Sequence, residues 1–304
     1  MRAIALLIAA AIASALALAG CTAIADDRPL VVVTTNILGD VVGTIVGDEA
    51  EVLVLMQPNV DPHSFEISAR EAARIQGADL LVSNGLGLEE GLQQHVDAAV
   101  AAGVASVSAG DLIEVLSYSA GESEGQPDPH FWTDPTRMIA VVSGVAEAVV
   151  ATVPGVDPTA IAANAASLQG DLHQLEEDMD AAFATIPAGH RNLVTNHHVF
   201  GYLADRFGFE VIGAVLPSGT TLAAPSASDL AGLATSIADA GVRTIFADSS
   251  QPDRLAQVLA DEGGVDVAVV PLYTESLTAP GEGAHTYLLM MRANTERIAT
   301  GLSP

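Results

Sequence analysis

The sequence predicts an α/β protein with two lobes, each a mostly four-stranded parallel sheet flanked by helices, joined by one long connecting helix. Short apolar, β-branched segments alternate with longer Ala-rich segments, which is typical of parallel βαβ units. A long amphipathic segment in the middle has four of the strand-like segments before it and four after it. The chain has 304 residues, of which 50% are hydrophobic, and this is enough to build the core of each lobe.

The expected strands are continuous apolar runs rather than alternating apolar and polar residues. Parallel strands show this pattern because helices cover both faces of their sheet. In the first half of the chain the expected strands span residues 30–34, 51–56, 79–83 and 104–108. In the second half they span residues 192–195, 209–214, 243–247 and 266–271.

The segments between the strands favour helices, for example at residues 68–76, 89–101, 134–153, 226–240, 252–262 and 283–300. The middle segment runs from about residue 158 to 186, with Asp157 as the expected N-cap and Pro158 as the first helical residue. Its apolar side chains recur at helical spacing from Leu168 to Phe183. We expect one connecting helix between two lobes; one more packed helix of a single domain is the alternative.

Residues 1–20 are expected to be a signal peptide that is removed. Arg2 precedes a run of apolar and small residues, as in secretory signals, and a permanent membrane-spanning helix is the alternative. Cys21 is the only cysteine, and its position resembles the acylated cysteine of bacterial lipoproteins. We therefore expect a chain lipid-anchored at Cys21 to the cell membrane, on the bacterial cell surface or in the periplasm. Residues 21–28 would be a tether, 29–156 the N-terminal lobe, 157–187 the connecting helix and 188–304 the C-terminal lobe.

The charge of the chain excludes one class of partner. The formal net charge is −27, with only 11 basic residues. Phosphate binding needs a basic surface, so we expect no nucleic-acid partner. An acidic surface attracts cations, although such a charge is also a common adaptation for solubility.

Histidine recurs at equal intervals in a pattern that indicates a metal site. The tripeptide Asp-Pro-His ends at His63 and again at His130, and His197 follows at the same spacing. Each histidine, like Glu275 further on, comes after an expected strand. Ligands of parallel α/β sheets bind beyond the carboxyl ends of the strands. Three imidazoles and a carboxylate complete a tetrahedral shell, so we expect His63, His130, His197 and Glu275 to bind one metal ion between the lobes.

The two Asp-Pro-His turns suit preorganised ligands. Proline fixes its own φ and restricts the residue before it, and the aspartate can accept the free ring N–H of a ligating histidine. Asp248 also ends an expected strand and is the reserve fourth ligand, with Glu66 a more distant candidate. His198 adjoins His197, and only one of the two can easily be a ligand. The remaining histidines are expected to be structural or exposed: His95, His173, His190 and His285.

The motifs resemble the zinc- and manganese-specific solute-binding proteins of bacterial ABC importers. The resemblance covers essentially the whole chain: Cys21, the turns at 61–66 and 128–132, the segment 78–89, and the turns at 197–202 and 272–277. It implies two lobes joined by a long helix, with the metal buried between them and delivered to a permease driven by an ATPase. Matching the turn at 197–202 to the family pattern implies that His197 is the ligand rather than His198. Many members have Asp where this chain has Glu275.

Three imidazoles favour zinc as the transported ion, since the harder manganese prefers more oxygen donors. A manganese or iron receptor on the same fold is the alternative. Zinc members often have a His-rich loop before the second ligand, but residues 118–126 are short and acidic here and contain no histidine.

We expect a binding protein rather than an enzyme, because four protein ligands leave no open position to activate water. A secreted zinc-dependent hydrolase with Glu66 or Asp248 as general base is the less favoured hypothesis. The receptor is expected to be a monomer.

Overall fold

The computed structural model describes residues 28–119, 121, 123–216, 218–262 and 267–303. Its first half contains a four-stranded parallel sheet with the strand order β2-β1-β3-β4. The strands are β1 (Leu30–Val33), β2 (Glu51–Val54), β3 (Leu80–Ser83) and β4 (Ser106–Ser108). The central strands β1 and β3 are almost wholly buried, as their continuous apolar runs predict.

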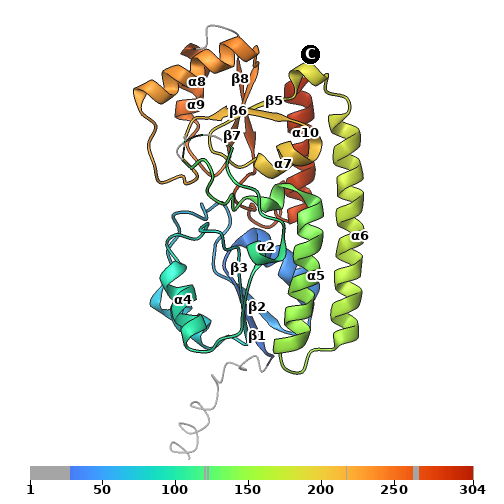
Figure 1. Ribbon diagram of the computed structural model, residues 1–304. Coiled ribbons are helices and arrows are strands. Elements are labelled where there is room, and N and C mark those ends of the chain that lie inside the picture. Colours follow the sequence, from blue (N-terminus) through green and yellow to red (C-terminus); the bar gives the residue numbers. More distant parts are fainter. Residues whose placement is uncertain (1–27, 120, 122, 217, 263–266, 304) are drawn as a thin grey trace, which may run out of the picture.

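The second half repeats this arrangement. A second four-stranded parallel sheet has the order β6-β5-β7-β8. Its strands are β5 (Asn192–Thr195), β6 (Glu210–Ala214), β7 (Thr244–Asp248) and β8 (Ala268–Leu272). Figure 1 shows the two sheets in separate lobes, one above the other. The predicted fold class is therefore confirmed.

Helices flank both sheets. They are α2 (Asn36–Val46), α3 (Ala69–Gln76), α4 (Gln93–Ala101), α5 (Pro135–Thr152), α6 (Pro158–Phe183), α7 (Gly201–Phe207), α8 (Ala227–Ala240), α9 (Arg254–Glu262) and α10 (Tyr287–Leu302). Short 3-10 turns lie at Ala109–Leu112, Phe131–Thr133 and Ala188–His190. Neither α2 nor α7 is among the helices expected from the sequence. For the other helices, most observed ends lie within two residues of the expected ends, but α4 and α10 begin four residues later than expected.

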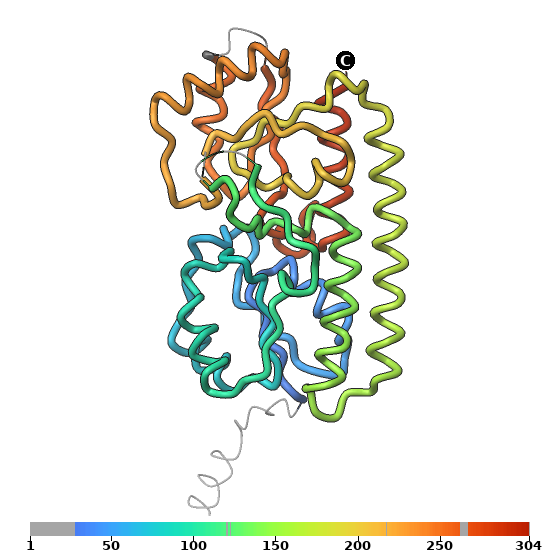
Figure 2. The backbone as a smooth tube through the Cα atoms, in the orientation of Figure 1, coloured from blue at the N-terminus to red at the C-terminus, as the bar shows by residue number. Residues whose placement is uncertain are grey.

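The long helix α6 runs beside both lobes (Figures 1 and 2). The Asp157 side chain accepts a hydrogen bond from the Thr159 N–H and caps the first turn, with Pro158 in the first helical position. The helix packs on α2 and α5 of the first lobe and on α10 of the second lobe. Its buried side chains belong to one apolar cluster that contains residues from both halves. The apolar stripe of α6 thus joins the two lobes through one continuous core.

The loops at the carboxyl ends of the two sheets meet each other. The Asn59 N–H donates to the Leu277 carbonyl at 2.9 Å, and Asn36 Nδ2 donates to Ser276 Oγ at 2.8 Å. The chain segments joined here lie more than two hundred residues apart in sequence. This junction is the place where ligands of parallel α/β sheets bind.

We predict that shortening a buried side chain on α6 destabilises the whole molecule. Leu172 is fully buried in the shared cluster, so Leu172→Ala should lower the free energy of unfolding by about 2–5 kcal/mol. Chemical denaturation of the metal-free protein measures this change. Leu289→Ala is the control, because Leu289 on α10 is exposed. An equal effect of the two variants would contradict the role given to α6.

Candidate metal centre

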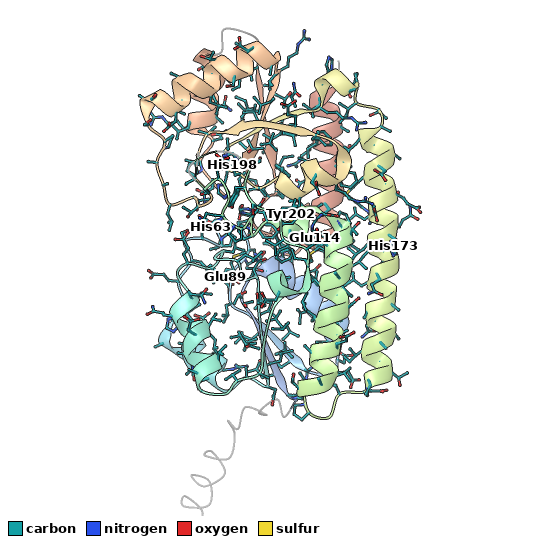
Figure 3. The ribbon with its side chains drawn as sticks, viewed as in Figure 1. His63, Glu89, Glu114, His173, His198 and Tyr202 are labelled. Carbon is teal, nitrogen blue, oxygen red and sulfur yellow. The ribbon has the colours of Figure 1, made fainter. Side chains whose placement is uncertain are left out.

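Four side chains meet at the junction of the two lobes. His63, His130, His197 and Glu275 each offer a ligand atom, and these atoms all lie within 4.8 Å of one another. All four side chains are buried, with at most 1% of any residue exposed. Figure 3 shows His63 between the two lobes, far from the outer helix that carries His173. These are the four residues that the sequence predicts as candidate ligands, and the fold places them close together.

The distances within the group suit a small cation. His130 Nε2 lies 3.4 Å from His63 Nε2 and 3.4 Å from Glu275 Oε1. His197 Nε2 lies 3.8 Å from the same carboxylate oxygen. Two donors bound to one zinc ion at about 2.1 Å in a tetrahedral shell lie roughly 3.4 Å apart. Small movements of the side chains would therefore be enough to form bonds to a common ion.

Most ring nitrogens and carboxylate oxygens of this group have no hydrogen-bond partner among the described residues. These atoms are His63 Nδ1, both ring nitrogens of His197 and both carboxylate oxygens of Glu275, and all of them are buried. Buried polar atoms are normally paired, because leaving them unpaired costs free energy. A cation is the partner that a carboxylate and neutral imidazoles can share.

Asp128 fixes the orientation of His130. Its Oδ1 accepts the His130 backbone N–H at 2.9 Å and lies 2.7 Å from His130 Nδ1. This leaves Nε2 facing the other ligands, as a carboxylate that holds a metal-binding histidine does. In the first turn, Asp61 likewise accepts the His63 backbone N–H at 2.9 Å. The expected bond between carboxylate and imidazole is thus present between Asp128 and His130. Asp61 contacts the backbone N–H of His63 and not its ring.

The second oxygen of Asp61 connects the two lobes. Asp61 Oδ2 accepts hydrogen bonds from Thr221 Oγ1 at 2.5 Å and from Gln251 Nε2 at 3.0 Å. Thr221 and Gln251 follow strands β6 and β7 of the second sheet. The turn that carries His63 is therefore held against the opposite lobe.

Glu89 organises the loop after β3 below the site (Figure 3). Its buried carboxylate accepts from the Thr34 hydroxyl at 2.5 Å, from the Asn84 N–H at 2.6 Å and from the Gly85 N–H at 3.2 Å. Asn84 Nδ2 in turn donates to the Pro129 carbonyl at 3.0 Å. This network supports the second Asp-Pro-His turn from beneath.

The three histidines differ in their affinity for protons. Burial lowers the pKa of His63, and burial together with the neighbouring imidazoles lowers that of His197 far below its usual range. Burial also disfavours the charged form of His130, but Glu275 and Asp128 outweigh this effect and raise its pKa to about 9. His63 and His197 therefore present neutral nitrogens, the form that binds metal.

Comparison with known proteins decides the family. Residues 31–301 match the family model described as "ZnuA: Zinc-uptake complex component A periplasmic". The chain belongs to this family. Its members are solute-binding proteins of ABC importers, which lie outside the cytoplasmic membrane.

Individual relatives of this ZnuA-family chain span nearly its full length. It is 29% identical over 280 residues to the manganese-binding lipoprotein MntA of Halalkalibacterium halodurans. The aligned region covers 91% of this chain and 90% of MntA. It is 30% identical over 285 residues to the zinc-binding protein TroA of Treponema pallidum, covering 92% and 91% respectively. The solved structure of periplasmic TroA matches with a TM-score of 0.83 at 28% identity, over 91% of this chain and 100% of that one.

The other candidate ligands of this ZnuA-family protein lie outside the group of four. Asp248 is buried, but it accepts hydrogen bonds from protein donors. Glu66 is exposed. His198 is half-buried, with its ring 6.2 Å from that of Tyr118. The histidines expected to be structural or exposed also lie outside the group: His95, His173, His190 and His285. Cys21, with the signal peptide, lies outside the described residues.

Two residues at the site make contacts that the sequence did not predict. Tyr118 Oη lies 3.3 Å from His130 Nδ1 and donates to the Gly219 carbonyl at 3.2 Å. Trp132 Nε1 donates to the Thr274 carbonyl at 2.8 Å and so ties the second histidine turn to the loop that carries Glu275. Both contacts join segments that are distant in sequence. The tryptophan was conspicuous beside His130, but its partner could not be predicted.

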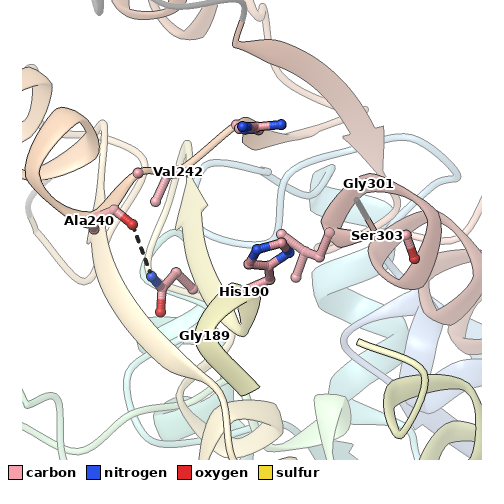
Figure 4. Close-up of a pocket in the computed structure, with 10 residues that line it drawn as sticks. Gly189, His190, Ala240, Val242, Gly301 and Ser303 are labelled. Atoms are coloured by element: carbon pink, nitrogen blue, oxygen red, sulfur yellow. Dashed lines mark hydrogen bonds between the residues drawn. The ribbon is translucent and has the colours of Figure 1, made fainter. Parts of the chain in front are cut away.

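A pocket at the far end of the second sheet does not belong to this site. Figure 4 shows it between Gly189, His190, Ala240, Val242 and the end of α10, where Asn192 Nδ2 donates to the Ala240 carbonyl at 3.4 Å. These residues stand at the amino ends of β5 and β7. Ligands of parallel α/β sheets bind at the opposite, carboxyl ends.

We predict that Asp128→Asn lowers the pKa of His130 in the metal-free protein by about 1 unit or more, because the charge that favours the imidazolium is lost while burial remains. NMR titration of the imidazole signals measures this change. Asp79→Asn is the control, since the Asp79 carboxylate accepts the Leu30 N–H at 2.8 Å and precedes β3, at the end of the sheet opposite the histidines. An unchanged His130 pKa would contradict the pairing with Asp128.

Proposed function

We propose that this protein is an extracytoplasmic receptor that captures Zn²⁺ with His63, His130, His197 and Glu275 and delivers it to an ABC importer. The observation that carries the proposal is the burial of these four side chains around one point. Within the described residues, both ring nitrogens of His197 and both carboxylate oxygens of Glu275 lack a hydrogen-bond partner, and a divalent cation would satisfy them together. Family membership supports transport as the purpose of this binding.

The donor set favours zinc over manganese. Three imidazole nitrogens with one carboxylate suit zinc, while manganese prefers oxygen-rich shells. The names of the relatives do not decide the question, since MntA is called manganese-binding and TroA zinc-binding. The proposal of zinc therefore depends on the chemistry of the residues in this chain.

A closed shell suits a receptor better than a catalyst. Catalytic zinc sites keep a position for water or substrate, whereas four protein ligands fill a tetrahedral shell. Glu66, the first general base considered for a hydrolase, is exposed and outside the group. The Asp248 carboxylate is occupied by hydrogen bonds from the protein.

The partners follow from the same proposal. The protein would pass zinc to the permease of an ABC importer, whose ATPase drives uptake, and would be held at the membrane by a lipid on Cys21. We propose that it acts as a monomer with lobes at residues 29–156 and 188–304 and a connecting segment at 157–187. Hydrogen bonds from both lobes to Asp61 support a receptor whose halves stay close together.

Competition between zinc and manganese on metal-stripped protein tests the proposal. We expect one zinc ion to bind per chain and manganese to displace it only at large excess, because imidazole donors favour zinc. Calorimetric titration with each metal, followed by displacement, measures both affinities. Tighter binding of manganese would contradict the assignment of zinc, and no binding of either ion would contradict the receptor.

The proposed ligand register predicts opposite results for two adjacent histidines. Zinc that binds only the folded state should raise the melting temperature. We expect His197→Ala to abolish this rise and His198→Ala to retain it, because only His197 lies in the group of four. Thermal unfolding with and without zinc measures the effect. The reverse result would place the ligand one residue further along the chain.

A further inference from the structure

The loop that carries Glu275 is held by a second buried carboxylate, that of Asp248 at the end of β7. Only 2% of Asp248 is exposed. Its Oδ2 accepts the backbone N–H groups of Thr274 and Glu275, each at 3.2 Å, and also the Thr274 hydroxyl. Its Oδ1 accepts the Ser250 N–H at 2.6 Å and the Ser250 hydroxyl. Both oxygens are therefore occupied by donors from the protein.

These hydrogen bonds tie the backbone of Glu275 to the Asp248 carboxylate. Glu275 lies in a loop after β8 rather than on a helix or strand, so local structure alone does not fix its backbone. Among the described residues, its carboxylate has no hydrogen-bond partner. Within the described residues, Asp248 accepts the Glu275 N–H directly. Trp132 holds the carbonyl of the preceding residue, Thr274, from the other lobe.

The Asp248 backbone also connects to the loop after β5 that carries His197. The Asp248 N–H donates to Asn196 Oδ1 at 2.8 Å, and the Asn196 N–H donates to the Phe246 carbonyl at 3.0 Å. Asn196 immediately precedes His197. The backbone of Asp248 thus contacts the loop of His197, while its carboxylate contacts the loop of Glu275.

We propose that Asp248 is a positioning residue that holds the Glu275 carboxylate in place for the metal, and not itself a ligand. The inference rests on the proposed metal-binding function. An ionised carboxylate suits this task because it accepts hydrogen bonds at both oxygens. An amide of the same shape has one oxygen and one NH₂ group, and its NH₂ group would face the N–H donors on one side.

The test compares Asp248→Asn with the wild type in zinc affinity. Loss of an outer carboxylate that orients a ligand typically weakens metal binding about 10- to 100-fold, and we expect a loss in this range. Co²⁺ replaces zinc as a spectroscopic probe, and its visible absorption bands should change as Glu275 leaves the coordination shell. The control is Asp79→Asn, whose carboxylate also accepts a backbone N–H but lies away from the site. It should leave both the zinc affinity and the Co²⁺ spectrum unchanged.

A double-mutant cycle separates positioning from general structural damage. If Asp248 acts through Glu275, adding Asp248→Asn to Glu275→Ala should weaken zinc binding no further than Glu275→Ala alone. Additive losses in the cycle would overturn the proposal. An unchanged zinc affinity and Co²⁺ spectrum in Asp248→Asn would overturn it as well.

A milder variant keeps the test valid if Asp248→Asn does not fold. Thr274→Val replaces the hydroxyl that donates to Asp248 with a methyl group of similar size, and we expect a zinc affinity several-fold weaker with an altered Co²⁺ spectrum. Unchanged affinity in this folded variant would count against the proposal. Failure of the wild type to bind zinc would instead overturn the proposed function, so the two failures are distinguishable.

Discussion

The structure depends on the burial of three imidazoles and a carboxylate in a space from which water is largely excluded. Unpaired donor atoms in such a place are costly, and here they belong to His63, His197 and Glu275. Their proximity suits a divalent cation, because a cation can satisfy a carboxylate and neutral imidazoles at once. The surrounding polar groups are arranged to maintain this convergence.

That convergence requires two lobes to hold a fixed relation. The apolar stripe of α6 packs along both halves and belongs to a core that they share. Direct hydrogen bonds add to this, including those between Asp61 and Thr221 and between Trp132 and the Thr274 carbonyl. A core that extends across both lobes limits the movements that they can make independently. Capture and release of an ion would then involve the loops at the junction more than the rigid sheets.

The sequence predicted the strands well because their signal is local, and it named as candidate ligands the three histidines that the fold places in one group. Apolar runs define parallel strands, and the repeated Asp-Pro-His turn marks His63 and His130 as candidate ligands. Helix α2 escaped prediction because most of its residues are buried, so it lacks the polar face that identifies an amphipathic helix. Helix α7 has only seven residues and no side-chain cap. The occupied carboxylate of Asp248 and the contact of Tyr118 with His130 depend on tertiary packing, which residue spacing does not encode.

X-ray absorption spectroscopy of the zinc-loaded protein tests the central claim most directly, since it reports the atoms bonded to the ion. The account predicts a four-coordinate shell with three imidazole nitrogens at about 2.0–2.1 Å and carboxylate oxygen at about 2.0–2.2 Å. A six-coordinate shell dominated by oxygen, or one with fewer than three imidazoles, would contradict it.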